Sequence, residues 1–191
     1  MPALPRTVLA AVLLVSGCTS TVSGLAGPGT RPSQAPELPA RARELAVTGI
    51  DPCALLTPAQ LDALQENGAP RLVDEDSTRD GPTCAFDVDA TRPTYTYYLE
   101  VVDVGIEDWI SGDHRETGMI QRPADVPGFP ALVNYAPSDG IQDCETLVGV
   151  AAGRTLRAQM APDDRSFDQR QLCDMATNVA KLAVQTLETL K

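Results

Sequence analysis

Hydrophobic and polar positions divide the chain into three stretches. A short apolar run follows a cationic start within residues 1–17. Residues 18–48 consist mainly of Ser, Thr, Gly, Pro and Ala, and large apolar side chains recur regularly only in residues 49–191. Because a stretch with few apolar groups does not offset the entropy of ordering, the pattern predicts a leader, then a disordered tether, then one globular domain.

The first helix of this domain is predicted by its capping residues. Thr57 and Gln60 have the spacing of a capping box, in which side chains and backbone N–H groups at a helix start satisfy each other. Leu61 and Leu64 then share a helical face, and Gly68 is a typical terminator. We expect a helix of about ten residues after Thr57.

The longest periodic pattern closes the chain. Ser166 and Gln169 repeat the capping-box spacing, and apolar residues then recur every three or four positions. This stripe consists of Leu172, Ala176, Val179, Ala183, Leu187 and Leu190. The pattern predicts a long C-terminal helix, with Cys173 beside the stripe and facing the sheet.

Between the helices, short segments rich in β-branched and aromatic residues predict strands. They cover residues 71–73, 84–88, 94–104, 131–135, 145–151 and 154–160. The turn at Ala152 and Gly153 favours a hairpin of the last two, in which Arg157 and Gln159 are expected on a wet face. Residues 112–122 give no clear pattern.

The order of these elements indicates the fold class. A short helix comes first, several antiparallel strands follow, with a helical turn around Trp109, and a long helix ends the chain. This order predicts a single α+β domain, an antiparallel sheet flanked by the two helices, and not a series of βαβ units.

The end of the leader carries a specific motif. Leu14-Val15-Ser16-Gly17 is followed directly by Cys18, and the arrangement resembles the lipobox of bacterial lipoprotein precursors. The resemblance implies cleavage before Cys18, lipid on its thiol, and anchoring at the extracytoplasmic face of the cell membrane. The leader is too short to span a bilayer, which takes about 20 apolar residues. The alternative is a plain secreted protein with an incidental cysteine.

Charge narrows the range of partners. The chain has a net charge of −11, and residues 51–191 carry 24 of its 26 acidic residues. Such a domain is unsuited to nucleic acid or to direct adhesion on an anionic membrane surface. We interpret the negative charge first as a means of keeping the domain soluble. Binding of a cationic partner is the second interpretation.

Four cysteines remain in the domain: Cys53, Cys84, Cys144 and Cys173. An even number in an exported protein predicts two disulfides, for which three pairings exist. Their spacings contain no CxxC, and His114 is the single histidine, so neither a zinc site nor another metal or cofactor site is predicted.

Several segments together resemble a known family. They are Asp51-Pro52-Cys53-Ala54-Leu55-Leu56-Thr57, Cys84-Ala85-Phe86, Gly128-Phe129-Pro130-Ala131, and the single cysteines Cys18, Cys144 and Cys173. The chain resembles the actinobacterial surface lipoproteins of the mycobacterial LprB and LprC types, a family with a domain of unknown function. The resemblance implies a compact sheet flanked by helices and no assigned reaction. With the order of the cysteines, it implies the pairs Cys53–Cys84 and Cys144–Cys173.

Catalytic signals are weak. His114 sits in a polar turn without a nucleophile motif, and a general base needs a reacting partner within hydrogen-bond reach. Asp87 and Asp89, with the acidic residues at 74–76, match no calcium loop. We interpret these as a loop histidine and a solvated acidic face, and name no catalytic residue.

The aromatic residues give the candidate binding surface. Tyr97 and Tyr98 are adjacent on a strand and point to opposite faces, and Trp109 follows nearby. The first interpretation is that these aromatic residues pack in the core, and the face with Tyr95, Tyr97 and Leu99 is expected to be buried. The second interpretation is a surface that binds a ligand or partner.

These observations favour a lipid-anchored, non-catalytic envelope domain that binds a protein or an apolar ligand. An envelope hydrolase with an unrecognised site is the alternative, and a structural accessory lipoprotein is a third hypothesis. No nucleic acid partner is expected.

Overall fold

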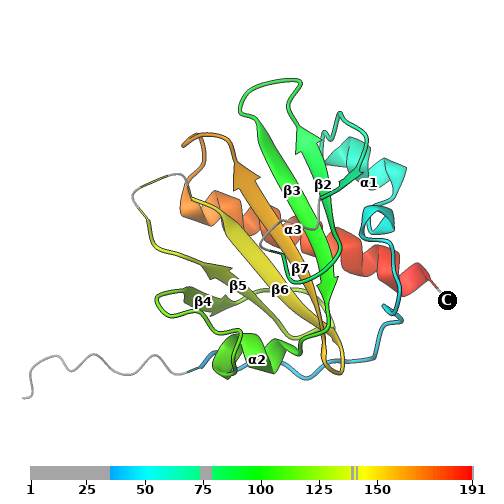
Figure 1. Ribbon diagram of the computed structural model, residues 1–191, viewed down its shortest axis with the longest axis vertical. Coiled ribbons are helices and arrows are strands. Elements are labelled where there is room, and N and C mark those ends of the chain that lie inside the picture. The colour runs from blue at the N-terminus through cyan, green and yellow to red at the C-terminus, as the bar shows by residue number, and fades with distance from the viewer. Residues whose placement is uncertain (1–34, 74–78, 139, 141, 191) are drawn as a thin grey trace, which may run out of the picture. The chain divides into compact units, whose positions relative to one another are not determined.

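The structure is a computed structural model that describes residues 35–73, 79–138, 140 and 142–190. It contains one compact unit, Ala35–Lys191 (Figure 1). The predicted leader and Cys18 lie outside the described residues. Within the described part of the chain, no helix is both long and apolar enough to cross a membrane.

The described residues of the unit form seven strands and a few helices. Six of the strands correspond to predicted segments, whereas the strand Ile120–Pro123 begins in residues 112–122, for which the sequence gives no clear pattern. The strands are β1 (Arg71–Leu72), β2 (Thr83–Val88), β3 (Tyr95–Val102), β4 (Ile120–Pro123), β5 (Ala131–Tyr135), β6 (Cys144–Ala151) and β7 (Arg154–Pro162). The helices are the 3-10 turn η1 (Pro52–Ala54), α1 (Pro58–Ala63), α2 (Ile106–Ser111) and α3 (Gln169–Thr189). All strand pairs are antiparallel in one sheet, ordered β1-β2-β3-β7-β6-β5-β4.

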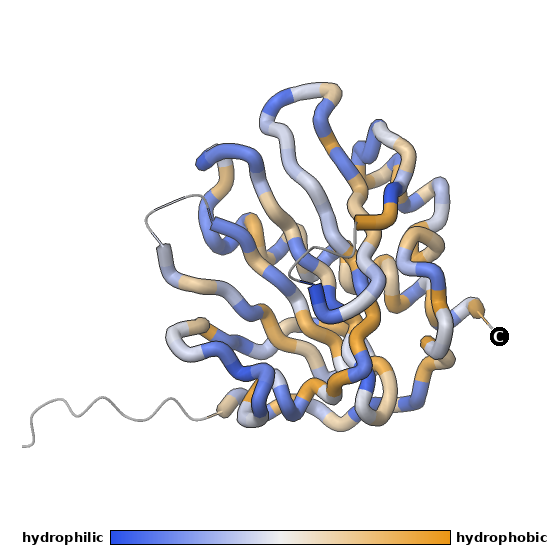
Figure 2. Tube along the Cα trace, viewed as in Figure 1, coloured by the Kyte–Doolittle hydropathy of each residue, from blue (hydrophilic) through white to orange (hydrophobic). Residues whose placement is uncertain are grey.

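α3 covers one face of the sheet, behind the strands in Figure 1, and contacts mainly β6 and β7. Its predicted stripe is buried from Leu172 to Leu187, whereas Leu190 is 41% exposed. The stripe packs on residues such as Leu99 and Leu156, which are fully buried. Figure 2 shows the resulting alternation of hydrophobic and hydrophilic positions along the central strands. Because α3 lies over the middle of the sheet, β4 and β5 extend beyond it.

α2 covers one end of the opposite face. Ile106 and Trp109 pack there on Val102, Leu132 and Leu147, which form a second, smaller apolar cluster. Both faces of β3 are therefore buried in part, because apolar residues on its second face meet α2 instead of water.

Local sequence explains where the helices begin. Thr57 and Gln60 form the predicted capping box of α1, but the helix has six residues and ends at Ala63, before Gly68. α3 begins two residues later than predicted, because Asp168 and Gln171 form its capping box. The charge of the Asp168 carboxylate also interacts favourably with the positive end of the helix dipole, an interaction that the hydroxyl of Ser166 lacks.

The segment before the domain is more ordered than its composition predicts. Residues 35–48 belong to the compact unit, whereas the sequence places them in the tether. Leu45 and Val47 are buried in the main core, and Leu45 donates a backbone hydrogen bond to Val150. Glu44 accepts a 2.6 Å hydrogen bond from the N–H of Ala152, which lowers the pKa of the Glu44 carboxyl. The two buried side chains and these hydrogen bonds together hold the segment against the sheet.

Both disulfides have the expected pairing. Cys53–Cys84 joins η1 to β2, and Cys144–Cys173 joins β6 to α3. The two bonds close loops of nearly equal length, with sequence separations of 31 and 29.

Candidate functional site

The predicted aromatic surface is largely interior. Tyr97 is 3% exposed and Trp109 is 4% exposed, so both are core residues. Burial raises the pKa of the Tyr97 hydroxyl. Tyr98 is half-buried, and the guanidinium of Arg79 lies 4.3 Å from its ring centroid. The structure therefore does not bring the three residues together as one exposed patch.

A buried ion network occupies the sheet face opposite α3. β7 lies between β3 and β6, and this order places Arg157 directly beside Glu100 and Leu147. Arg157 donates to Glu100 at 2.9 Å and also to Glu145. Glu100 is 1% exposed and Glu145 is 6% exposed, so the expected wet face of β7 is mostly buried.

Neighbouring polar side chains donate further hydrogen bonds to the two carboxylates of this network. Glu100 also accepts from the hydroxyl of Thr83, and Glu145 accepts from the amide of Asn134. Burial raises the pKa of Glu100, while Arg157 and Thr83 lower it in part. Both carboxylates are therefore paired inside the protein and form one buried network with Arg157.

His114 and the acidic pairs are not brought into a reactive cluster. The His114 ring lies 5.2 Å from the Trp109 ring. Asp87 accepts from Thr96 and Arg71, and Asp89 accepts from Asn67. The described residues contain no group of three or more His, Cys, Asp or Glu side chains suited to a metal ion. The acidic residues at 74–76 lie outside the described part.

One accessible hollow of the unit lies where α3 leaves β4 and β5 uncovered. It is a groove of about 700 Å³. One wall is the face of α3 from Gln169 to Lys181, and the other consists of β4, β5 and the residues Ala124 and Asp125 that follow β4. A pocket of this size is typical of ligand sites in proteins.

The charged side chains of the groove are mostly positive, whereas the whole chain has a net charge of −11. Its walls carry the cations Arg122, Arg170 and Lys181 and the acids Asp125 and Asp174. Lys181 and Asp125 form a largely exposed ion pair at 3.3 Å. Cations therefore outnumber acids here, although in the whole chain 26 acidic residues face 15 Lys and Arg.

The two arginines of the groove are available for binding. Among the residues that the structure describes, neither Arg122 nor Arg170 has a carboxylate partner. The Arg122 guanidinium instead lies 5.2 Å from the centroid of the buried Tyr135 ring. A guanidinium on an aromatic face keeps its N–H donors free for a planar anion.

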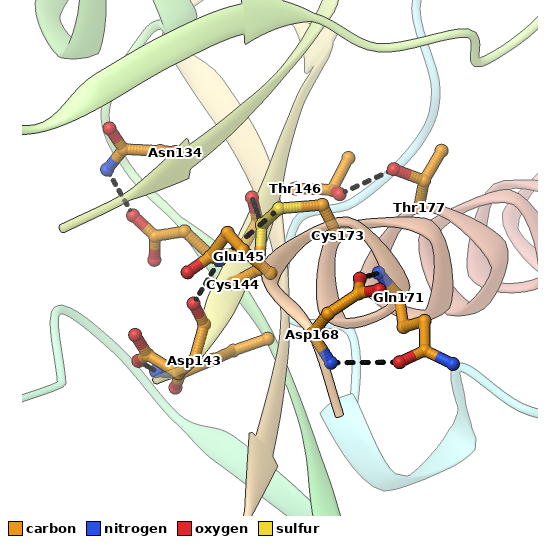
Figure 3. Close-up of a disulfide and its surroundings, with 11 residues drawn as sticks. Asn134, Asp143, Cys144, Glu145, Thr146, Asp168, Gln171, Cys173 and Thr177 are labelled. Carbon is orange, nitrogen blue, oxygen red and sulfur yellow. Dashed lines mark hydrogen bonds between the residues drawn. A yellow bond between two sulfur atoms is a disulfide. The ribbon is translucent and has the colours of Figure 1, made fainter. Parts of the chain in front are cut away.

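The disulfide Cys144–Cys173 ties the helical wall of the groove to β6 (Figure 3). One turn further along α3, the hydroxyls of Thr146 and Thr177 lie 3.0 Å apart. Gln169 donates through Nε2 to the carbonyl of Asp143. Its Oε1 is buried and has no hydrogen-bond partner among the described residues. Gln169, which lines the groove beside Arg170, thus holds a buried acceptor that no described residue uses.

Sequence reasoning missed both the groove and the network. Arg122 lies in the segment without a clear pattern, and Arg170 is an ordinary polar residue on the predicted helix. The alternation of apolar and polar residues around Arg157 is visible in the sequence. The acidic partners of Arg157 lie on two other strands, and the sequence does not reveal that these strands flank β7.

Comparison with known proteins finds no curated protein and no solved structure that matches the chain. A family model described as a protein of unknown function (DUF3558) matches residues 13–186. The chain belongs to this domain-of-unknown-function family, DUF3558.

Proposed function

We propose that this protein is a lipid-anchored, extracytoplasmic binding domain without catalytic activity. Lipid on Cys18 would hold it at the cell membrane, and the groove beside α3 would receive its ligand. The affiliation with actinobacterial surface lipoproteins of the LprB and LprC type is part of this proposal. Of the two kinds of ligand expected from the sequence, a protein and an apolar molecule, we favour the first, because the groove carries charged and amide side chains beside its apolar ones.

The anchoring part rests on the sequence motif and is supported by cysteine usage. Leu14 to Cys18 has lipobox order, and the two disulfides suit an oxidising compartment outside the cytoplasm. A stable anchor takes two or more acyl chains, because one chain binds only marginally.

The binding part rests on one observation: the groove leaves two guanidiniums without carboxylate partners in a strongly acidic chain. Five other described arginines, such as Arg41, Arg71 and Arg157, have carboxylate partners, whereas Arg79, Arg92, Arg115 and Arg165 have none among the described residues. Arg122 and Arg170 differ from these four because they line the two walls of one hollow. Unpaired cations on both walls of one hollow suit a ligand that supplies the missing acceptors.

Cys18→Ala is expected to move the protein from the detergent phase to the aqueous phase, or to block its processing. The reason is that the substitution removes the thiol that would carry the diacylglycerol. Detergent-phase partitioning of the expressed full chain measures this, with Ser20→Ala as a control that keeps Cys18 and both disulfides. Equal partitioning of Cys18→Ala and the parent would refute the lipoprotein assignment.

The binding role is tested by screening the full mature chain in detergent micelles against amino acids, sugars, short peptides and fatty acids. Amide resonances of Thr177 and Asn178 should shift for at least one class. Asn178→Trp should fill the groove and abolish the shifts, whereas Gln185→Trp, on an exposed part of α3 outside the groove, should preserve them. If no compound class perturbs the groove, the binding role is wrong.

A further inference from the structure

We infer that the ligand of the groove is an acidic peptide bound in extended form, with a carboxylate held between Arg122 and Arg170. This inference rests on the proposed function, because it assigns a ligand class to the same groove.

The charge of the groove favours an acidic ligand. Arg122 on β4 and Arg170 on α3 line the two walls, and neither has a carboxylate partner among the described residues. Arginine binds carboxylates through two parallel hydrogen bonds, which gives geometric selectivity as well as attraction. The ring of Tyr135 holds the Arg122 guanidinium in place from below.

The length of the groove favours a linear ligand over a compact one. α3 rises roughly 18 Å between Gln169 and Lys181, which matches about six residues in extended conformation. A second hollow of about 390 Å³ shares Tyr135 and Gln169 with the groove and continues past Pro137 and Ser138. A linear ligand can follow both hollows, whereas a single anion would use only one end.

The unused acceptor favours a peptide among linear anions. Gln169 lines the groove, but its Oε1 is buried and lacks a hydrogen-bond partner among the described residues, so a ligand donor reaches this oxygen only when the side chain turns. An unsatisfied buried acceptor is costly, and a donor from the ligand removes that cost. A peptide supplies backbone N–H donors along its length, and small side chains can pack on Pro123, Ala124 and Val133.

The test uses the full mature chain in detergent micelles and three labelled, end-blocked hexapeptides: alternating Ala and Glu, alternating Ala and Gln, and alternating Ala and Lys. Fluorescence anisotropy at 0.15 M salt measures their affinities. We expect the Glu peptide to bind at least tenfold more tightly than the others, and inorganic phosphate at millimolar concentration to compete only partly.

Arg122→Gln and Arg170→Gln should each weaken the Glu peptide about tenfold, which corresponds to one lost charge-assisted contact of about 1.4 kcal/mol. Arg92→Gln removes the same charge from an exposed loop outside the groove and should change the affinity less than twofold. Equal losses for Arg92→Gln and the groove variants would mean general charge attraction and would overturn the inference.

Two other outcomes separate this inference from the proposed function. If the Gln peptide binds as tightly as the Glu peptide and Asn178→Trp abolishes both, the groove is a binding site but the acidic ligand is wrong. If phosphate displaces the peptide completely and binds equally well, the site recognises a single anion and not a peptide. Absence of binding by all probes, together with an unperturbed groove in the screen, would refute both proposals.

Discussion

Arg157→Leu is expected to lower the free energy of unfolding by about 3–5 kcal/mol. The substitution leaves Glu100 and Glu145 buried without their shared cation. An uncompensated buried charge costs more than the net contribution of the intact network, so the loss should exceed that of an ordinary core substitution. Urea denaturation of the full mature chain at pH 7 measures the effect.

Arg154→Leu is the matched control for this variant. Arg154 begins the same strand and pairs with Asp103, whose side chain is 76% exposed. Exposed ion pairs contribute about 0–1 kcal/mol, so this variant should remain close to the parent. Replacing Arg157, Glu100 and Glu145 together with Leu should recover most of the lost stability, because no charge then stays buried alone. A triple variant as unstable as Arg157→Leu would contradict the charge explanation.

The pH dependence of the Arg157→Leu deficit follows from Glu100. Burial already raises the pKa of this carboxyl above its ordinary value of 4.5, and loss of Arg157 removes an interaction that lowers it. A folded-state pKa above the unfolded one gives stability at low pH that is lost as pH rises through the folded pKa. The deficit relative to the parent should therefore shrink from pH 7 toward pH 5. A deficit that grows on acidification would show that another group dominates.

Local signals were sufficient for most of the fold. The capping box at Thr57 and Gln60, the hairpin turn at Ala152 and Gly153, and the apolar stripe of α3 each depend on residues that are neighbours in sequence. Their physical causes act within one turn or one residue pair, so pattern reasoning reaches them.

The features that the sequence did not reveal depend on contacts between residues that are far apart in the chain. Arg157 looks like an exposed residue until β7 is inserted between β3 and β6, which places acidic residues on both sides. The groove depends on how far β4 and β5 extend beyond α3, and Arg122 sits in a four-residue edge strand with little pattern of its own. Leu45 and Val47 were too isolated in a polar segment to indicate burial. In each case the deciding partner is far away in sequence.

Removing Cys144–Cys173 by the double substitution Cys144→Ala and Cys173→Ala is expected to lower the free energy of unfolding by roughly 3–4 kcal/mol. The bond closes a loop between residues separated by 29 positions, and the same estimate applies to Cys53–Cys84, with a separation of 31. In the chain-entropy account, the two double variants should lose nearly equal stability. Urea denaturation of both variants measures this.

The two disulfides should differ in their effect on the groove. Cys173 lines the groove and ties the N-terminal part of α3 to β6, whereas Cys53 and Cys84 lie outside it. Without the bond, no covalent tie holds that part of the helix, and only the packing of Leu172 and Ala176, the Thr146–Thr177 contact and the Gln169 hydrogen bond remain. Amide exchange over residues 169–177 should speed up, and groove ligands should weaken, only in the Cys144→Ala and Cys173→Ala variant. Unchanged exchange there, or an equal change on loss of Cys53–Cys84, would show that the disulfide does not position the helical wall.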